Sequence, residues 1–168
     1  MELRLRPLTT ADEAEARSAH VELAHDGFTF LLDWTPEAPW PRYLAALRDR
    51  RRGFALPADR VPASFLVADA GGVLVGRTSI RHALNDHLTA VGGHIGYGVR
   101  PAYRRRGVGT EILRQSLIVA RAEGVDPVLV VCEEENLVSA SVIERLGGVF
   151  EDVRLDAAGT RMRRYWLA

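Results

Sequence analysis

The chain has 168 residues, of which 47% are hydrophobic and 26% charged, and its formal net charge at pH 7 is zero. This length suits one domain, and the composition is that of an ordinary globular protein. No apolar run reaches the roughly 18 residues of a membrane helix, so we expect no membrane partner. All basic residues are arginine, and the zero net charge gives no long-range attraction to nucleic acid. Cys132 is the sole cysteine, which fits a cytoplasmic protein without disulfides.

The first half of the chain predicts one strand and two helices. Leucine alternates with charged residues over 2–6, as in a half-buried strand that ends at Pro7. The spacing Thr10-Ala-Asp-Glu13 matches a capping box and predicts a helix from there to about His25. Apolar residues at helical spacing from Trp40, with Pro41 in the first turn, predict a second helix that stops at Gly53.

The second half alternates strands with helices and indicates a mixed α/β sheet. Three strands with glycine-rich turns are predicted at "SFLVAD", "GVLVGRTSIRHAL" and "GGHIGYGV". A helix follows from Val108 to Gly124, and "PVLVVC" has the continuous apolar character of a buried strand. A further helix runs from Asn136 to Leu146, and "GVFEDVRL" and "TRMRRYWL" form a closing hairpin across "DAAG".

The segment "VRPAYRRRGVGTEIL", residues 99–113, lies between a predicted strand and a predicted helix. Unpaired backbone N–H groups and the positive dipole end at such a helix start attract an anion. Gly107 and Gly109 allow close approach of the main chain, and the arginines add donors suited to phosphate oxygens. The pattern therefore favours a site for one compact anion such as a pyrophosphate.

Other interpretations of this loop fare less well. A Walker loop requires a lysine, and a dinucleotide-binding G-x-G-x-x-G would require glycine where the chain has Ile112. A nucleic-acid patch usually spreads over a face with several aromatics, whereas Tyr103 is the one aromatic beside these arginines. A solvated arginine run explains the charge but not the two glycines.

The motif Arg104-x-x-Gly107-x-Gly109 resembles the Q/R-x-x-G-x-G/A motif of the GNAT superfamily of N-acetyltransferases. The preceding Val99-Arg-Pro101 and the later "NLVSASVIERLGG" are similar to the segments that flank this motif in the family. The resemblance covers nearly the whole chain and implies a single domain over 1–168 of the α/β (α+β) class. It implies a mixed, mostly antiparallel sheet of six to seven strands, about four helices and a splayed central strand pair.

The resemblance also implies acetyl-CoA as the co-substrate and no metal. The cofactor-binding residues that it implies are Tyr97, Val99, Arg104, Arg105, Arg106, Gly107, Val108, Gly109, Thr110, Asn136 and Ser139. In this scheme the loop amides hold the pyrophosphate, and main-chain groups near Tyr97 and Val99 pair with the pantetheine arm. The amide of Asn136 either binds the cofactor, as in the family, or is a plain helix N-cap.

The family's chemistry is direct attack of an amine on the thioester, with a backbone N–H near Val99 serving the oxyanion. Many members carry a tyrosine seven residues after the asparagine as general acid, but this chain has Ile143 there. The family's usual base positions match Gly93 and Ile95, which cannot take a proton. We therefore consider three other side chains as catalytic candidates, namely His94, His82 and Tyr97, each of which also has a purely structural interpretation.

The acceptor pocket of such folds lies in the N-terminal region, where acidic and aromatic groups suit a cationic amine. The candidates there are Asp33, Trp34, Glu37 and Trp40. We interpret Cys132 as a core thiol and Glu133–Glu135 as a solvated loop. The sequence thus predicts an acyl-CoA-dependent N-acyltransferase for a small-molecule or peptide amine, with a homodimer left open. The alternative is a non-catalytic CoA-binding sensor or partner module.

Overall fold

The computed structural model describes residues 2–168 and contains one seven-stranded sheet in the order β1-β2-β3-β4-β5-β7-β6. The strands are β1 (Arg4–Arg6), β2 (Ala63–Asp69), β3 (Leu74–Arg81), β4 (Ile95–Val99), β5 (Val128–Glu133), β6 (Val149–Leu155) and β7 (Arg161–Leu167). The longer helices are α1 (Glu13–Ala24), α2 (Trp40–Arg52), α3 (Val108–Ala122) and α4 (Leu137–Arg145). Every neighbouring pair is antiparallel except β4 and β5, which confirms the predicted mixed sheet and element order.

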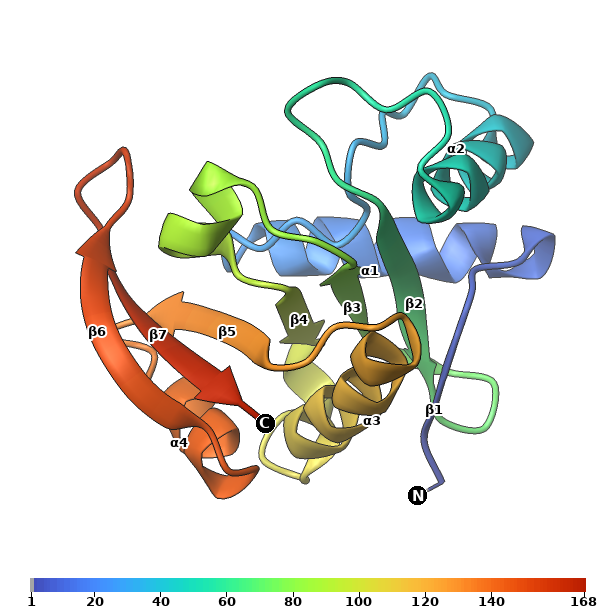
Figure 1. The fold of residues 1–168 in the computed structure, drawn as a ribbon. Coiled ribbons are helices and arrows are strands. Elements are labelled where there is room, and N and C mark those ends of the chain that lie inside the picture. Colours follow the sequence, from blue (N-terminus) through green and yellow to red (C-terminus); the bar gives the residue numbers. More distant parts are fainter. Residues whose placement is uncertain (1) are drawn as a thin grey trace.

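Helices cover both faces of the sheet, with α1 and α2 on the upper side and α3 and α4 on the lower side in Figure 1. The upper core packs Leu23, Phe30 and Trp40 against Phe65 and Val67 of β2. The lower core packs apolar residues of α3 and α4 against alternate residues of β3, β4 and β5. Strand alternation therefore assigns each side chain of β3 and β4 to one face or the other.

The central strands β4 and β5 are paired at one position, Ile95 with Val130, and diverge beyond it. Arg100 N–H donates to the Val75 carbonyl and Arg81 N–H to the His94 carbonyl, so even-numbered residues of β4 face β3. The N–H and C=O groups of Tyr97 and Val99 consequently point away from β3, toward the opening beside β5. The predicted splayed central pair is confirmed.

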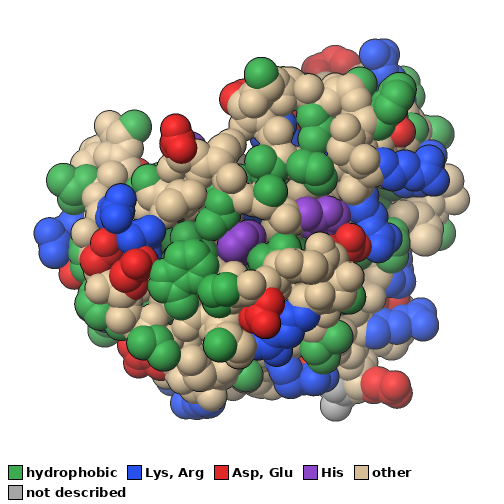
Figure 2. Space-filling view, in the orientation of Figure 1, with side chains coloured by type: hydrophobic (Ala, Val, Ile, Leu, Met, Phe, Trp, Pro, Cys, Tyr) green, Lys and Arg blue, Asp and Glu red, His purple; other side chains and the backbone are tan. Residues whose placement is uncertain are grey.

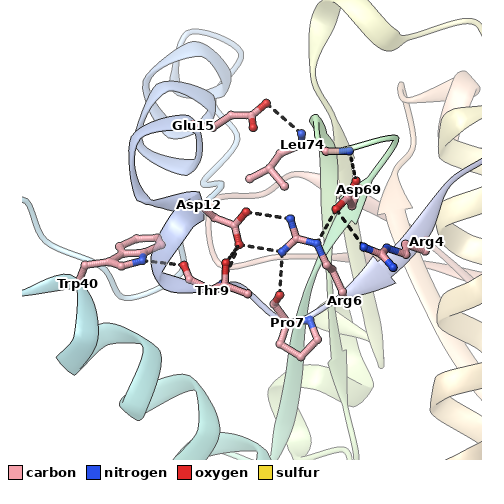
Figure 3. A network of polar contacts seen from close by, with 10 residues as sticks. Arg4, Arg6, Pro7, Thr9, Asp12, Glu15, Trp40, Asp69 and Leu74 are labelled. Atoms are coloured by element: carbon pink, nitrogen blue, oxygen red, sulfur yellow. Dashed lines mark hydrogen bonds and ion pairs between the residues drawn. The ribbon is translucent and has the colours of Figure 1, made fainter.

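The N-terminus of the first helix differs from the prediction by one residue. The capping box forms between Thr9 and Asp12, because the Asp12 carboxylate accepts the Thr9 N–H at 2.7 Å, rather than between Thr10 and Glu13. A short 3-10 turn, Thr10–Asp12, therefore precedes α1. Asp12 is favoured at this position because Arg6 of β1 reaches the same carboxylate through both terminal nitrogens, at 2.7 and 2.8 Å (Figure 3).

Arg6 joins three elements through two buried carboxylates. Its Nε atom donates to Asp69 of β2 at 2.6 Å, while its terminal nitrogens bind Asp12 (Figure 3). The hydrogen bonds from Arg6 lower the pKa of Asp12 to about 2. Both carboxylates are therefore ionised at neutral pH, and Arg6 is their main compensating charge.

Replacing Arg6 by methionine should lower the free energy of unfolding by roughly 3–5 kcal/mol, because two buried carboxylates lose their cation. Arg4→Met is the matched control, since Arg4 lies 3.9 Å from Asp69 with a side chain 76% exposed, against 21% for Arg6. Its cost should stay below about 1 kcal/mol. Urea unfolding at neutral pH measures both, and equal losses in the two variants would contradict this account.

Candidate functional site

A cleft of about 960 Å³ opens where β4 and β5 separate. Its walls come from the end of α1 and the segment after it, from β4, from the loop before α3 and from α4. Nine of the predicted cofactor-binding residues line it, namely Tyr97, Val99, Arg104, Arg105, Gly107, Gly109, Thr110, Asn136 and Ser139. Residues separated by some 40 positions in the sequence are thus brought to one surface.

The loop before α3 presents backbone donors to this cleft. Gly107 has φ of 78° as the N-cap, and the first helical hydrogen bond runs from Glu111 N–H to the Gly107 carbonyl. The amides of Val108, Gly109 and Thr110 therefore precede the helical ladder, as helix N-termini require. The Val108 side chain is buried and anchors the turn, while Arg105 and Arg106 are exposed. This end of the cleft is suited to an anion.

Arg104 has a different role from its two neighbours. Its guanidinium forms an ion pair with Asp26 at 2.6 Å and donates from Nε to the Val99 carbonyl at 3.0 Å. It therefore links the segment after α1 to the end of β4 across the mouth of the cleft.

Tyr97 and Ser139 form the floor of the cleft. Tyr97 extends from β4 and its hydroxyl lies 3.0 Å from Oγ of Ser139 on α4. Burial raises the pKa of Tyr97, so the phenol stays protonated at neutral pH. Asn136 accepts the Ser139 N–H at 3.0 Å and so caps α4, while it also lines the cleft. The floor thus carries two hydroxyl groups that can exchange a proton.

His94 lies at the apex of the opening, just before β4. It is 6% exposed, its main chain N–H donates to the Leu129 carbonyl at 2.7 Å, and its Nδ1 accepts the Leu129 N–H at 2.9 Å. Burial, with a smaller effect from Arg81, lowers the pKa of His94 to about 4. The ring is therefore neutral at pH 7, with its Nδ1 lone pair bonded to β5 and its proton on Nε2.

His94 does not line the cleft, and neither do the remaining catalytic and acceptor candidates apart from Tyr97. His82 contacts Oγ of Ser64 at 2.9 Å and lies 4.0 Å from Glu123 near the end of α3. Trp40 is 2% exposed and donates its indole N–H to the Thr9 carbonyl. Trp34 packs against the ring of His20 beneath Arg17, whereas Glu37 is exposed on the segment between α1 and α2.

Asp33 is exposed and forms ion pairs with Arg50 at 2.6 Å and Arg60 at 3.1 Å. It has a left-handed φ of 57°, an unusual conformation for a residue other than glycine. The ion pairs hold this turn between α2 and the segment before β2. The carboxylate that we expected to meet an amine therefore faces two arginines.

Several cleft residues carry no recognisable sequence signal. Phe28, from the segment after α1, packs so closely on β4 that a Cβ at Gly98 would overlap its ring. The repeated glycines of "GYGV" indicate a close approach, but they do not identify its partner. Leu137 and Val138 of α4 also line the cleft and are exposed, which an apolar ligand arm would explain.

Among residues 2–168, no group of three or more His, Cys, Asp or Glu side chains is arranged to hold a metal ion. Within the same range, no helix has both the length and the apolar character needed to cross a membrane.

A mixed sheet that opens between two parallel strands, beside a helix N-terminus, defines the architecture of the GNAT acetyltransferases. The family model of the acetyltransferase (GNAT) domain matches residues 2–149, and the chain belongs to this family. A search of curated proteins returns no match.

Three solved structures illustrate the structural likeness. yncA from Salmonella typhimurium, with its cofactor acetyl-CoA, is 17% identical with a TM-score of 0.65, covering 98% of this chain and 92% of its own. Ribosomal-protein-S5-alanine acetyltransferase from Vibrio fischeri is 16% identical with a TM-score of 0.71, covering 99% and 93%. The ribosomal L7/L12 α-N-protein acetyltransferase RimL, in complex with coenzyme A through a disulfide to a cysteine, is 16% identical with a TM-score of 0.66, covering 98% and 93%. At these identities the likeness concerns the fold.

The low pKa of His94 predicts a pH-dependent stability. Because the unfolded histidine titrates near 6.5 and the folded one near 4, the unfolded chain binds more protons between these values. The stabilisation is complete above about pH 6.5 and is lost as the pH falls toward 4. His94→Asn keeps an acceptor for the Leu129 N–H without this titration.

Urea unfolding at about pH 7.5 and about pH 5 should show the wild type losing roughly 1–2 kcal/mol more than His94→Asn. His20 and His82, whose pKa values are also lowered, remain in both proteins, so the difference isolates His94. Identical pH dependence in the two proteins would rule out a buried neutral His94.

Proposed function

We propose that the protein is an N-acetyltransferase that binds acetyl-CoA in the opening between β4 and β5 and transfers its acetyl group to a primary amine. The observation that carries the proposal is that one cleft joins the free amides before α3 to the edge of β4 that β5 leaves unpaired. Family membership and the acetyl-CoA named for yncA support it. We treat residues 1–168 as one catalytic domain that works in the cytoplasm, without a metal.

The cleft suits the two chemically different parts of the cofactor. The amides of Val108, Gly109 and Thr110 would bind the pyrophosphate, with Arg105 and Arg106 as exposed charged donors at the rim. The main-chain N–H and C=O of Tyr97 would pair with the amides of the pantetheine arm, as an added strand does. Leu137 and Val138 would cover the apolar portion of the arm from α4.

In the reaction, a neutral amine nitrogen attacks the thioester carbonyl, the N–C bond forms and the C–S bond breaks. The Val99 N–H is our candidate donor to the oxyanion, since it points into the opening. The departing thiolate takes up a proton. The acceptor nitrogen, positively charged once it is bonded to the carbonyl carbon, loses a proton to water. A neutral acceptor amine and one well-placed acid are then sufficient.

We propose Tyr97 as the acid that protonates the thiolate. Ile143 is fully buried in the lower core and carries no proton that it could donate. Tyr97 supplies a phenol from β4 instead, with a raised pKa and with Ser139 beside it to relay a proton from water back to the phenolate. His94 is then a positioning residue, because its contacts to Leu129 hold β4 and β5 together where the opening begins.

The rival function is a CoA-binding module without transferase activity, which the absence of the family tyrosine at position 143 would suit. Such a module would bind CoA in the same cleft and would differ from the proposed enzyme only in not transferring the acetyl group. Release of free thiol from acetyl-CoA across a panel of amines distinguishes the two, since turnover with any amine excludes the rival.

Isothermal titration should show acetyl-CoA binding to the wild type, and Gly109→Trp should weaken it by roughly 10-fold or more, because the indole blocks the loop amides. Gly109 has ordinary contacts to Tyr97 and Val99, so the larger side chain must extend into the cleft. Ile118→Trp, on the exposed side of α3, is the matched control and should bind normally. Absence of wild-type binding at high micromolar acetyl-CoA would refute the proposal.

Tyr97→Phe should lower kcat by roughly 10²-fold, because the thiolate loses its proton donor. The dissociation constant for acetyl-CoA should change little, since the main chain of β4 is retained. Tyr103→Phe, in the 3-10 turn Pro101–Tyr103, is the control for loss of a tyrosine hydroxyl. Steady-state kinetics decide the point, and an unchanged kcat in Tyr97→Phe would show that the acid lies elsewhere.

A further inference from the structure

Three arginines, Arg50, Arg60 and Arg81, lie near one another on the upper side of the sheet, and one carboxylate, that of Asp33, pairs with the first two. Arg50 of α2 and Arg60 of the segment before β2 both pair with Asp33, at 2.6 and 3.1 Å. Arg81 ends β3 and pairs with Ala63, which is three residues after Arg60. Burial lowers the pKa of Arg81, and the charges of Arg50 and Arg60 lower it further. In Figure 2 blue arginine atoms are visible within a hollow in the upper part of the molecule. The cluster carries excess positive charge.

Arg81 has no acidic partner within residues 2–168. The side chain of Arg81 forms two hydrogen bonds, both from Nη1, to the carbonyls of Gly92 and Gly93 at 3.2 and 3.3 Å. The Nε and Nη2 atoms of Arg81 form no hydrogen bond and are not fully buried, so they are accessible to solvent. A largely buried guanidinium is normally neutralised, and here the counter-charge is missing.

Arg81 also lies next to the strand that the cofactor would follow. A Cβ at Gly96 of β4 would be 3.4 Å from Nη1 of Arg81, on the sheet face opposite Tyr97. Gly98, which lines the cleft, is two residues further along β4, or about 7 Å in a strand. Arg81 therefore lies about two residues of β4 away from the cleft, and a molecule held by it would approach the opening past the Phe28 ring.

We propose that the acceptor is an amine that carries a carboxylate close to its nitrogen, as an α-amino acid does, and that Arg81 binds this carboxylate. The planar guanidinium suits a carboxylate, to which it can donate two parallel hydrogen bonds. Arg50 and Arg60 add positive charge, and Asp33 holds them in place rather than meeting the amine. This inference rests on the proposed function and specifies its substrate class.

A purely structural role is the competing explanation, in which Arg81 stabilises the carbonyls of the π-helical turn Leu88–Gly92 and of Gly93. Such a role would affect all acceptors equally. The carboxylate role affects acceptors selectively, which makes the two separable.

The test compares leucine with leucinamide, which has the same shape without the carboxylate charge. Measured by thiol release from acetyl-CoA, kcat/KM should be roughly 10-fold or more higher for leucine than for leucinamide. The amine of leucinamide is less basic, so more of it is neutral at a given pH, and this chemical effect works against the expected preference. Arg81→Met and Arg60→Gln should reduce the rate with leucine by a much larger factor than the rate with leucinamide. Arg60 has a side chain 46% exposed, so its replacement spares the fold.

Arg48→Gln, at an exposed position of the same helix as Arg50, is the matched control and should alter neither substrate. Thermal unfolding of the CoA complex gives a readout independent of turnover, and leucine but not leucinamide should raise its Tm. Equal rates with the two compounds, or equal losses with both in Arg81→Met, would overturn the inference while the proposed function stands. Failure to bind acetyl-CoA and to turn over any amine would reject both.

Discussion

The separation of β4 from β5 is the constraint on which the rest of the molecule depends. Two parallel neighbours in a sheet normally satisfy each other's main chain, yet here they pair at Ile95 and Val130 and then diverge. His94 closes the apex with two hydrogen bonds to Leu129, one from its main chain and one through its ring. Beyond the apex, the open edge of β4 needs a partner, and the cleft supplies the space for one.

The two faces of the sheet divide the work at this opening. On the lower side, the N-terminus of α3 presents free amides to the cleft, and Tyr97 of β4 and Ser139 of α4 form its floor. On the upper side, Phe28 packs on Gly98, and Arg81 lies beside Gly96. Alternation along β4 thus places the proposed acid and the proposed anion site on opposite faces, so that the acceptor and the thiol leaving group need not compete for one surface.

Local patterns are enough to predict the elements and the phosphate loop, because glycines, caps and apolar periodicity act over a few residues. The contacts of Phe28, His94 and Arg81 could not be predicted, since each depends on a strand or segment distant in sequence. The acceptor candidates show the same limit. The sequence makes Trp40 a candidate for the acceptor pocket, but its side chain lies in the core. Asp33, a candidate partner for a cationic amine, forms ion pairs with two arginines.

The central claim is that the open edge of β4 receives acetyl-CoA as an added strand. Amide hydrogen exchange, followed residue by residue with and without acetyl-CoA, tests it most directly. The account predicts slower exchange at Tyr97 and Val99 and at the amides of residues 108–110, with little change at Gly96 and Gly98, which already face β3. Binding of acetyl-CoA without protection of Tyr97 and Val99 would contradict it.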